Sequence, residues 1–116
     1  METEELKERT KAFAHRCVKL ALALPDNPLG RHIRGQLIHC STSVASNYRA
    51  ACIAQSKASF VSKLSVAFKE ADETTFWLEF TIDENLLKKE LVEPLLQESN
   101  ELTAIFMSSR KTARRK

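Results

Sequence analysis

The sequence predicts an all-α fold, an antiparallel up-down-up-down four-helix bundle that forms a single domain. Apolar residues recur at steps of three and four residues in four segments of the chain, which is the period of a helix with one buried face. The 116 residues include only two Gly and three Pro, so breaks between helices are few. Each segment spans about 20 residues or more, and short connections between long helices favour antiparallel neighbours.

The first helix is predicted over residues 4–24. Pro25 disfavours helical geometry at the residue before it, so we expect the chain to turn over residues 24–27. The apolar stripe of this helix consists of Leu6, Thr10, Phe13, Cys17, Leu20 and Leu24.

The second helix is predicted over residues 28–52, because Asn27 is a favourable N-cap and Pro28 suits the first helical position. Gly35 lies inside this helix, where Gly costs about 1 kcal/mol relative to Ala. We therefore predict that another helix crosses closely at Gly35. The stripe of the second helix consists of Ile33, Leu37, Cys40, Val44, Tyr48 and Ala51.

The third helix is predicted over residues 57–83, with Ser56 as its N-cap. Asn85 tolerates a left-handed backbone, so we expect the helix to end just before it. Its heptad positions are Val61, Leu64, Phe68, Ala71, Thr75, Leu78 and Ile82.

The fourth helix is predicted over residues 87–109, where the bundle ends, and the basic residues 110–116 are predicted to form a disordered tail. The stripe of this helix consists of Leu87, Leu91, Leu95, Leu102 and Phe106.

The cysteines indicate neither disulfides nor a zinc site. Cys17, Cys40 and Cys52 are odd in number and contain no CxxC pair, so we interpret them as free thiols that fill the core. The acidic start of the chain does not fit a secretory signal, and no stretch approaches the length of a bilayer span. We expect a cytoplasmic protein that does not engage a membrane.

No pattern indicates catalysis. Di-iron sites in four-helix bundles use Glu-x-x-His pairs, and no histidine of this chain follows a glutamate by three residues. Ser41 and Ser43 lack the strand-to-helix turn and the oriented base that a nucleophile needs. We therefore expect no enzyme activity, no metal and no cofactor. Asn47 is interpreted as a residue that makes a structural hydrogen bond, with a role in packing specificity as the alternative.

The charges are segregated along the chain. Residues 9–69 contain ten Lys or Arg and one acid, whereas residues 70–109 contain ten acids and two Lys. In one interpretation the basic residues bind phosphates. In a second, the acidic part of one subunit meets the basic part of the next; in a third, they are solvated faces with weak exposed ion pairs. The candidate nucleic-acid-binding residues are Arg31, Arg34, Arg49, Lys57, Lys63, Lys69, Arg110, Lys111, Arg114 and Arg115.

A group of aromatic residues is a candidate subunit interface. Phe76, Trp77 and Phe80 cannot all share one narrow stripe with Leu78, so part of this group should face outward in a monomer. An outward apolar patch is better explained by an oligomer interface than by a platform on which bases stack.

The chain also resembles a known family. The segments that carry the resemblance are Gly35-Gln-Leu, Ser41-Thr-Ser-Val-Ala-Ser-Asn-Tyr-Arg-Ala-Ala, Lys63-Leu, Glu70-Ala-Asp-Glu and Phe76-Trp-Leu. Together they look like the bacterial four-helix-bundle proteins encoded in intervening sequences of 23S ribosomal RNA genes. The accessory protein of diversity-generating retroelements, which binds nucleic acid beside a reverse transcriptase, is similar in architecture.

This resemblance implies a non-enzymatic homo-oligomer, often a five-fold ring, that associates with nucleic acid. The sequence-based hypothesis is therefore a pentameric scaffold that binds RNA, or else DNA, through its basic surface, with a nucleic-acid-handling protein as a further partner. The alternative is a protein-interaction adaptor in which the charge polarity serves self-assembly only.

Overall fold

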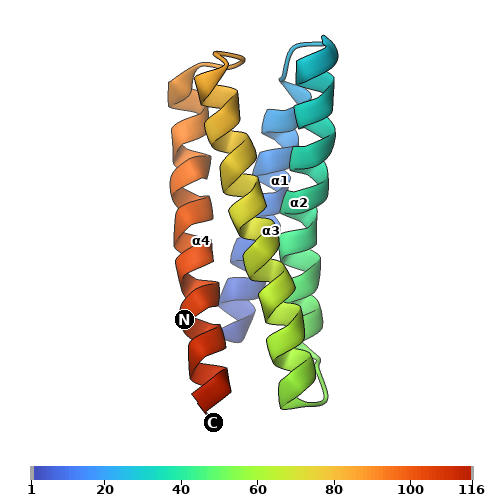
Figure 1. The fold of residues 1–116 in the computed structure, drawn as a ribbon, viewed down its shortest axis with the longest axis vertical. Coiled ribbons are helices and arrows are strands. Elements are labelled where there is room, and N and C mark those ends of the chain that lie inside the picture. Colours follow the sequence, from blue (N-terminus) through green and yellow to red (C-terminus); the bar gives the residue numbers. More distant parts are fainter. Residues whose placement is uncertain (1, 116) are drawn as a thin grey trace.

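The protein folds into four antiparallel helices (Figure 1). The computed structural model describes residues 2–115, so residue 116 of the predicted tail lies outside the described residues. The helices are α1 (Thr3–Leu22), α2 (Pro28–Cys52), α3 (Lys57–Asp83) and α4 (Lys89–Arg115). Each helix packs against the next, and α1 closes the bundle against α4. The resulting rod measures 46 × 20 × 20 Å, which confirms the predicted architecture.

The helix ends follow from local sequence chemistry. The Asn27 side chain accepts a hydrogen bond from the Gly30 backbone N–H at 2.7 Å, and Ser56 accepts one from the Ser59 N–H at 3.0 Å. At the end of α3, Asn85 has a φ of 54°, and the Leu86 N–H donates to the Thr81 carbonyl. These contacts confirm the two predicted N-caps and the left-handed turn.

α4 differs from the prediction at both ends. It begins two residues later than predicted and remains helical through Arg115, where the sequence predicted a disordered tail. Lys57 Nζ donates to the Arg114 carbonyl at 3.5 Å, and the Arg110 guanidinium lies 4.7 Å above the Phe68 ring. Cationic side chains also interact favourably with the dipole at a helix C-terminus. The basic segment therefore forms the last turns of α4.

The core confirms the stripes predicted for the first two helices, because every residue of both stripes is buried. On α3, however, the predicted heptad is only partly buried, and the buried face also includes Glu70, Thr74 and Thr81. Both threonine hydroxyls donate to backbone carbonyls four residues earlier, at 2.8 Å, which satisfies them inside the core. On α4, Leu91 is 57% exposed, and Val92 is buried in its place. The prediction for Leu91 was wrong.

Polar contacts join α4 to its two neighbours. Ser99 is fully buried, donates to the Ala71 carbonyl at 3.1 Å and lies 2.7 Å from the Thr75 hydroxyl. On the other side, Arg9 donates to both oxygens of Glu98 at 2.7 Å and to Glu101 at 2.8 Å. We call this set of hydrogen bonds the Arg9 fork. It links α1 to α4, and the Arg9 guanidinium holds the pKa of Glu98 below its ordinary value.

Asn47 and two of the three cysteines behave as the sequence predicts, whereas the free thiol Cys52 is only half-buried. Cys17 and Cys40 are buried free thiols, and burial raises their pKa values to about 12 and about 11. Thiolates, the reactive form, are therefore scarce at neutral pH. Asn47 Nδ2 donates to the Ser43 carbonyl and hydroxyl, each at 2.9 Å, which is the predicted structural hydrogen bond.

The close approach predicted at Gly35 is absent. Gly35 is exposed, and a Cβ added there would meet no atom within 4 Å. The tight position is instead Gly30, which is buried at the start of α2, where an added Cβ would overlap the Pro25 carbonyl oxygen. The prediction failed because it did not apply the helical period: Gly35 is two residues from both Ile33 and Leu37 of the buried stripe, about 200° around the helix, and so faces solvent.

The two glycines yield opposite predictions. Gly35→Ala should stabilise the protein by up to about 1 kcal/mol, because Ala has the higher helix propensity and meets no clash. Gly30→Ala should destabilise it, because the backbone of the turn before α2 must shift. Chemical denaturation of both variants measures the two changes. Equal effects of the same sign would contradict this assignment.

The Arg9 fork predicts a pH-dependent stability. Because the folded-state pKa of Glu98 is lowered, its contribution is present above the ordinary carboxyl pKa and is lost as the pH falls through the folded-state value. Arg9→Met should cost about 1–2 kcal/mol at pH 7 and less at pH 3. Arg31→Met is the control, because the Arg31–Asp26 pair is exposed and should contribute under about 0.5 kcal/mol. A pH-independent loss for Arg9→Met would contradict this role.

Candidate self-association and nucleic-acid interfaces

An aromatic patch lies on the outer side of α3 near its C-terminal end. Phe76, Trp77 and Phe80 contact one another with ring centroids 4.9 to 5.9 Å apart, and His32 of α2 meets Trp77 edge-on at 5.4 Å. We call these four residues the aromatic patch. Phe76 is 51% exposed, and Trp77 and Phe80 are half-buried. The predicted outward aromatic group is therefore present on the monomer surface.

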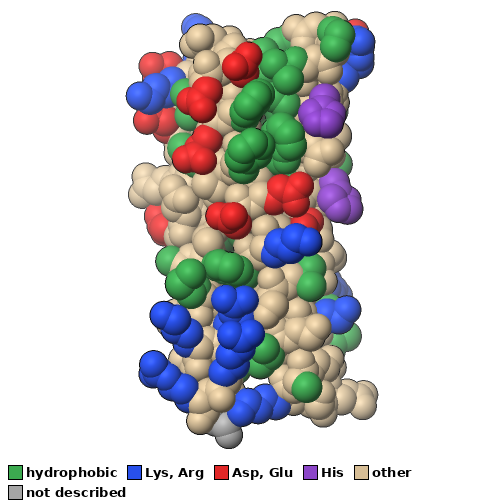
Figure 2. Space-filling model, in the orientation of Figure 1, with side chains coloured by type: hydrophobic (Ala, Val, Ile, Leu, Met, Phe, Trp, Pro, Cys, Tyr) green, Lys and Arg blue, Asp and Glu red, His purple; other side chains and the backbone are tan. Residues whose placement is uncertain are grey.

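Acidic side chains surround the aromatic patch. Residues 70–83 of α3 contain five acids and no Lys or Arg. Glu73 lies one helical turn before Phe76, and Glu79 and Asp83 follow at similar spacing on the exposed surface. Figure 2 shows hydrophobic side chains over the upper part of α3 with acidic groups beside them. The patch combines apolar area with negative charge.

Two polar atoms beneath this region have no hydrogen-bond partner among the described residues. One is Nε1 of Trp77, and the other is Oε2 of Glu70, whose side chain is 10% exposed. His39 Nε2 lies 3.8 Å from that carboxylate oxygen, too far for a hydrogen bond. Buried polar groups without a hydrogen-bond partner cost free energy in the folded state.

Six basic residues lie at the opposite end of the rod, where α3 begins and α4 ends. Figure 2 shows Lys and Arg side chains gathered below the acidic region. None of the six forms an ion pair with a carboxylate of residues 2–115, as far as the described residues extend. We call this group the basic end cluster. It consists of Lys57, Lys63, Arg110, Lys111, Arg114 and Arg115.

The other four predicted phosphate ligands lie elsewhere. Arg31 pairs with Asp26 at 3.0 Å, and Arg34 donates to the Leu24 carbonyl at 3.0 Å, both at the end of the rod that carries the aromatic patch. Lys69 is exposed midway along α3, and Arg49 lies between α1 and α2. The ten residues therefore form one cluster and several separate positions, a division that spacing in the sequence does not show.

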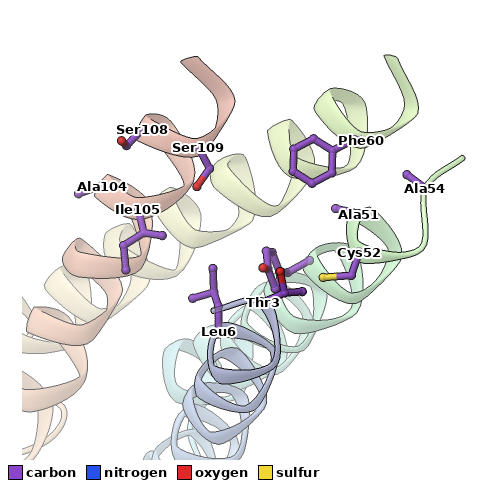
Figure 3. A pocket seen from close by; sticks show the side chains of 11 residues that line it. Thr3, Leu6, Ala51, Cys52, Ala54, Phe60, Ala104, Ile105, Ser108 and Ser109 are labelled. Atoms are coloured by element: carbon purple, nitrogen blue, oxygen red, sulfur yellow. The ribbon is translucent and has the colours of Figure 1, made fainter. Parts of the chain in front are cut away.

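A recess of about 700 Å³ opens beside the basic end cluster (Figure 3). All four helices contribute to it, with Leu6 of α1, Cys52 of α2, Phe60 of α3 and Ile105 of α4 around the space. The Ser109 hydroxyl points into it. A second hollow, between α3 and α4, shares Phe60 and Ser109 with the first. The basic end of the rod therefore carries two recesses. No charged side chain lines the larger one.

A groove of about 680 Å³ runs between α1 and α2. We call it the α1–α2 groove. Small side chains, Ala14, Ala45 and Ser46, line its middle, and its accessible surface is mostly apolar. Lys11 and Arg49 lie along it and form no ion pair among the described residues, whereas Glu4 is paired with Lys7 at 3.2 Å. The sequence analysis missed this groove, because its residues come from two helices and show no common motif.

Two classes of feature are not found in residues 2–115. No helix among them is long and apolar enough to cross a membrane. No group of three or more His, Cys, Asp or Glu side chains in this part of the chain is arranged to hold a metal ion.

Comparisons with known proteins agree with the fold. A crystal structure of a protein of unknown function from the S23 ribosomal protein family of Bacteroides thetaiotaomicron matches with a TM-score of 0.87 and 33% sequence identity, over 96% of this chain and 99% of that one. The comparison with curated proteins finds no match. The family model described as 23S rRNA-intervening sequence protein matches residues 2–108. The chain therefore belongs to the 23S rRNA-intervening sequence protein family.

Proposed function

We propose that the protein is a non-enzymatic homo-oligomeric scaffold that binds RNA through its basic end cluster. The observation that carries the proposal is the clustering of six cationic side chains without carboxylate partners among the described residues. Such a cluster binds phosphates by releasing their counterions, independently of base sequence. Structured RNA is the chosen ligand because it presents closely spaced phosphates.

The geometry of α4 supports this role. Because the helix continues through Arg115, its last four basic residues project from a fixed backbone rather than from a disordered arm. Lys57 is held beside Arg114 by its contact with the carbonyl at 3.5 Å. The first turn of α1 lies at the same end and carries Glu4 and Glu5, so the phosphate surface is the α3–α4 side of this end.

Self-association would bring several basic end clusters together in one oligomer. The aromatic patch, with Phe76 51% exposed, is the proposed contact between subunits. Several copies that present their basic ends in one direction gain avidity for a polyanion without any single strong site. Five copies is the number that we propose, because the family resemblance implies a pentamer. The proposed compartment is the cytoplasm.

A second function, that of a protein-interaction adaptor, is favoured by the acidic surround of the aromatic patch. Five acids within residues 70–83 repel nucleic acid, so this end of the rod suits a protein partner. In that function the basic residues serve assembly or solubility.

The RNA proposal predicts binding that is tight at low salt and weakens steeply as salt rises. The probe is a structured ribosomal RNA fragment, measured by fluorescence anisotropy across a salt series. The double variant Lys111→Ala/Arg115→Ala should raise Kd about tenfold and reduce the salt slope by about two. A DNA duplex measured in parallel separates RNA preference from general polyanion binding.

The matched control is Arg31→Ala/Lys88→Ala, which removes the same charge from the opposite end of the rod. It should change Kd by less than about twofold. Equal losses for both double variants would mean that binding follows net charge. No binding at low salt would refute the RNA proposal and favour the adaptor.

The assembly proposal predicts a mass above the 13.2 kDa of one chain in light scattering. Trp77→Ala should lower this mass, because it removes the central ring of the patch. Leu91→Ala is the control, since Leu91 is 57% exposed on α4 and lies outside the patch. Circular dichroism checks that both variants remain helical. A folded Trp77→Ala variant with the parent's mass would place the interface elsewhere.

A further inference from the structure

We infer that the aromatic patch of one copy docks into the α1–α2 groove of a second copy of this chain. The inference rests on the proposed self-association and specifies the two different surfaces that meet. Both are present on every copy, and both are open in the isolated subunit.

The two surfaces are complementary in shape. The patch projects large rings, led by Phe76, from one helix. The groove has small side chains in its middle, Ala14, Ala45 and Ser46, and a mostly apolar surface. Its volume of about 680 Å³ lies within the range of pockets that enclose ligands of several rings. Aromatic side chains that enter such a groove bury roughly 150–250 Å² each.

The two surfaces are also complementary in charge. The groove is lined by three bases, Lys7, Lys11 and Arg49, and by two acids, Glu4 and Glu8, and Glu4 is already paired with Lys7. The patch lies within residues 70–83, which contain five acids and no base. Lys11 and Arg49 on the groove, like Glu73 and Glu79 beside the patch, form no ion pair among the described residues. Docking would give each set a partner of opposite sign.

The same charges oppose the symmetric alternative. A two-fold contact of patch against patch would bring the acidic residues of both copies together. Patch against groove is heterologous, so a docked pair keeps one free patch and one free groove, and assembly continues.

The positions of the two surfaces on the bundle determine how each docked copy is rotated relative to its neighbour. The patch lies over α2 and α3, whereas the groove lies between α1 and α2, on an adjacent side of the bundle. Repeated contacts between adjacent sides rotate each copy relative to the last, and such a contact forms a ring where the rotation closes and a helical filament where it does not. The patch is near the C-terminal end of α3 and the groove extends to the N-terminal end of α1, so neighbouring rods are inclined or shifted along their length.

The test uses two variants that each break one surface at an exposed position. Phe76→Glu places a charge in the patch, and Ser46→Trp fills the groove. Each variant alone should dissociate where the parent stays assembled, with an apparent Kd raised about tenfold or more. The decisive sample is their equimolar mixture, in which one intact patch meets one intact groove. Light scattering should then show a complex of two chains, each of 13.2 kDa.

The controls make the same changes elsewhere. Leu91→Glu and Gln97→Trp alter exposed positions of α4, outside both surfaces, and should keep the parent's mass. Circular dichroism verifies folding of all four variants.

The outcomes separate this inference from the function on which it rests. An assembled parent with a fully assembled Ser46→Trp variant overturns the docking but leaves self-association intact. A mixture that remains monomeric also overturns it. A parent that is monomeric at all concentrations refutes self-association itself, while RNA binding is measured independently.

Discussion

The structure depends on the closure of the bundle between its first and last helices. The other helix pairs are joined by short turns, whereas α1 and α4 are distant in sequence and must meet through side chains alone. Phe13 and Phe106 are buried in the core, and truncating such a ring costs about 3–5 kcal/mol. The Arg9 fork to Glu98 and Glu101 fixes the register of the two helices. Closure leaves the basic end, the aromatic patch and the groove on three separate parts of one rigid rod.

This separation permits the proposed activities to coexist. The acids near Phe76 lie at the end of the rod remote from the basic end cluster, so a subunit contact there leaves Lys111 and Arg114 free. Because the cluster belongs to helix ends rather than to a mobile arm, its spacing on an assembled scaffold is set by the scaffold. The arrangement of the proposed RNA-binding surfaces is therefore determined by how the subunits of the proposed oligomer are arranged.

Most of the fold could be predicted from the sequence, because its determinants are local. Asn27 and Ser56 cap helices through contacts three residues away, and the first two apolar stripes follow from helical period. Most of the predictions that failed concern features that depend on how the helices pack against one another. The hydroxyls of the buried threonines on α3 donate hydrogen bonds to backbone carbonyls of the same helix, which allows these polar residues into the core. A search for apolar residues alone does not find them. The split of the basic residues, and the groove near Ala45, arise only when helices pack side by side.

The charges of α3 oppose its own dipole. Its first turns carry Lys57 and Lys63, and its last turn carries Asp83, whereas a helix is stabilised by acids at its start and bases at its end. Each unfavourable end charge costs about 0.3–1 kcal/mol. Selection for thermal stability alone would replace these residues and thereby weaken both the basic end cluster and the acidic surround of the aromatic patch. Stability and surface chemistry conflict at both ends of this helix, so a more heat-resistant variant altered there would be a poorer scaffold.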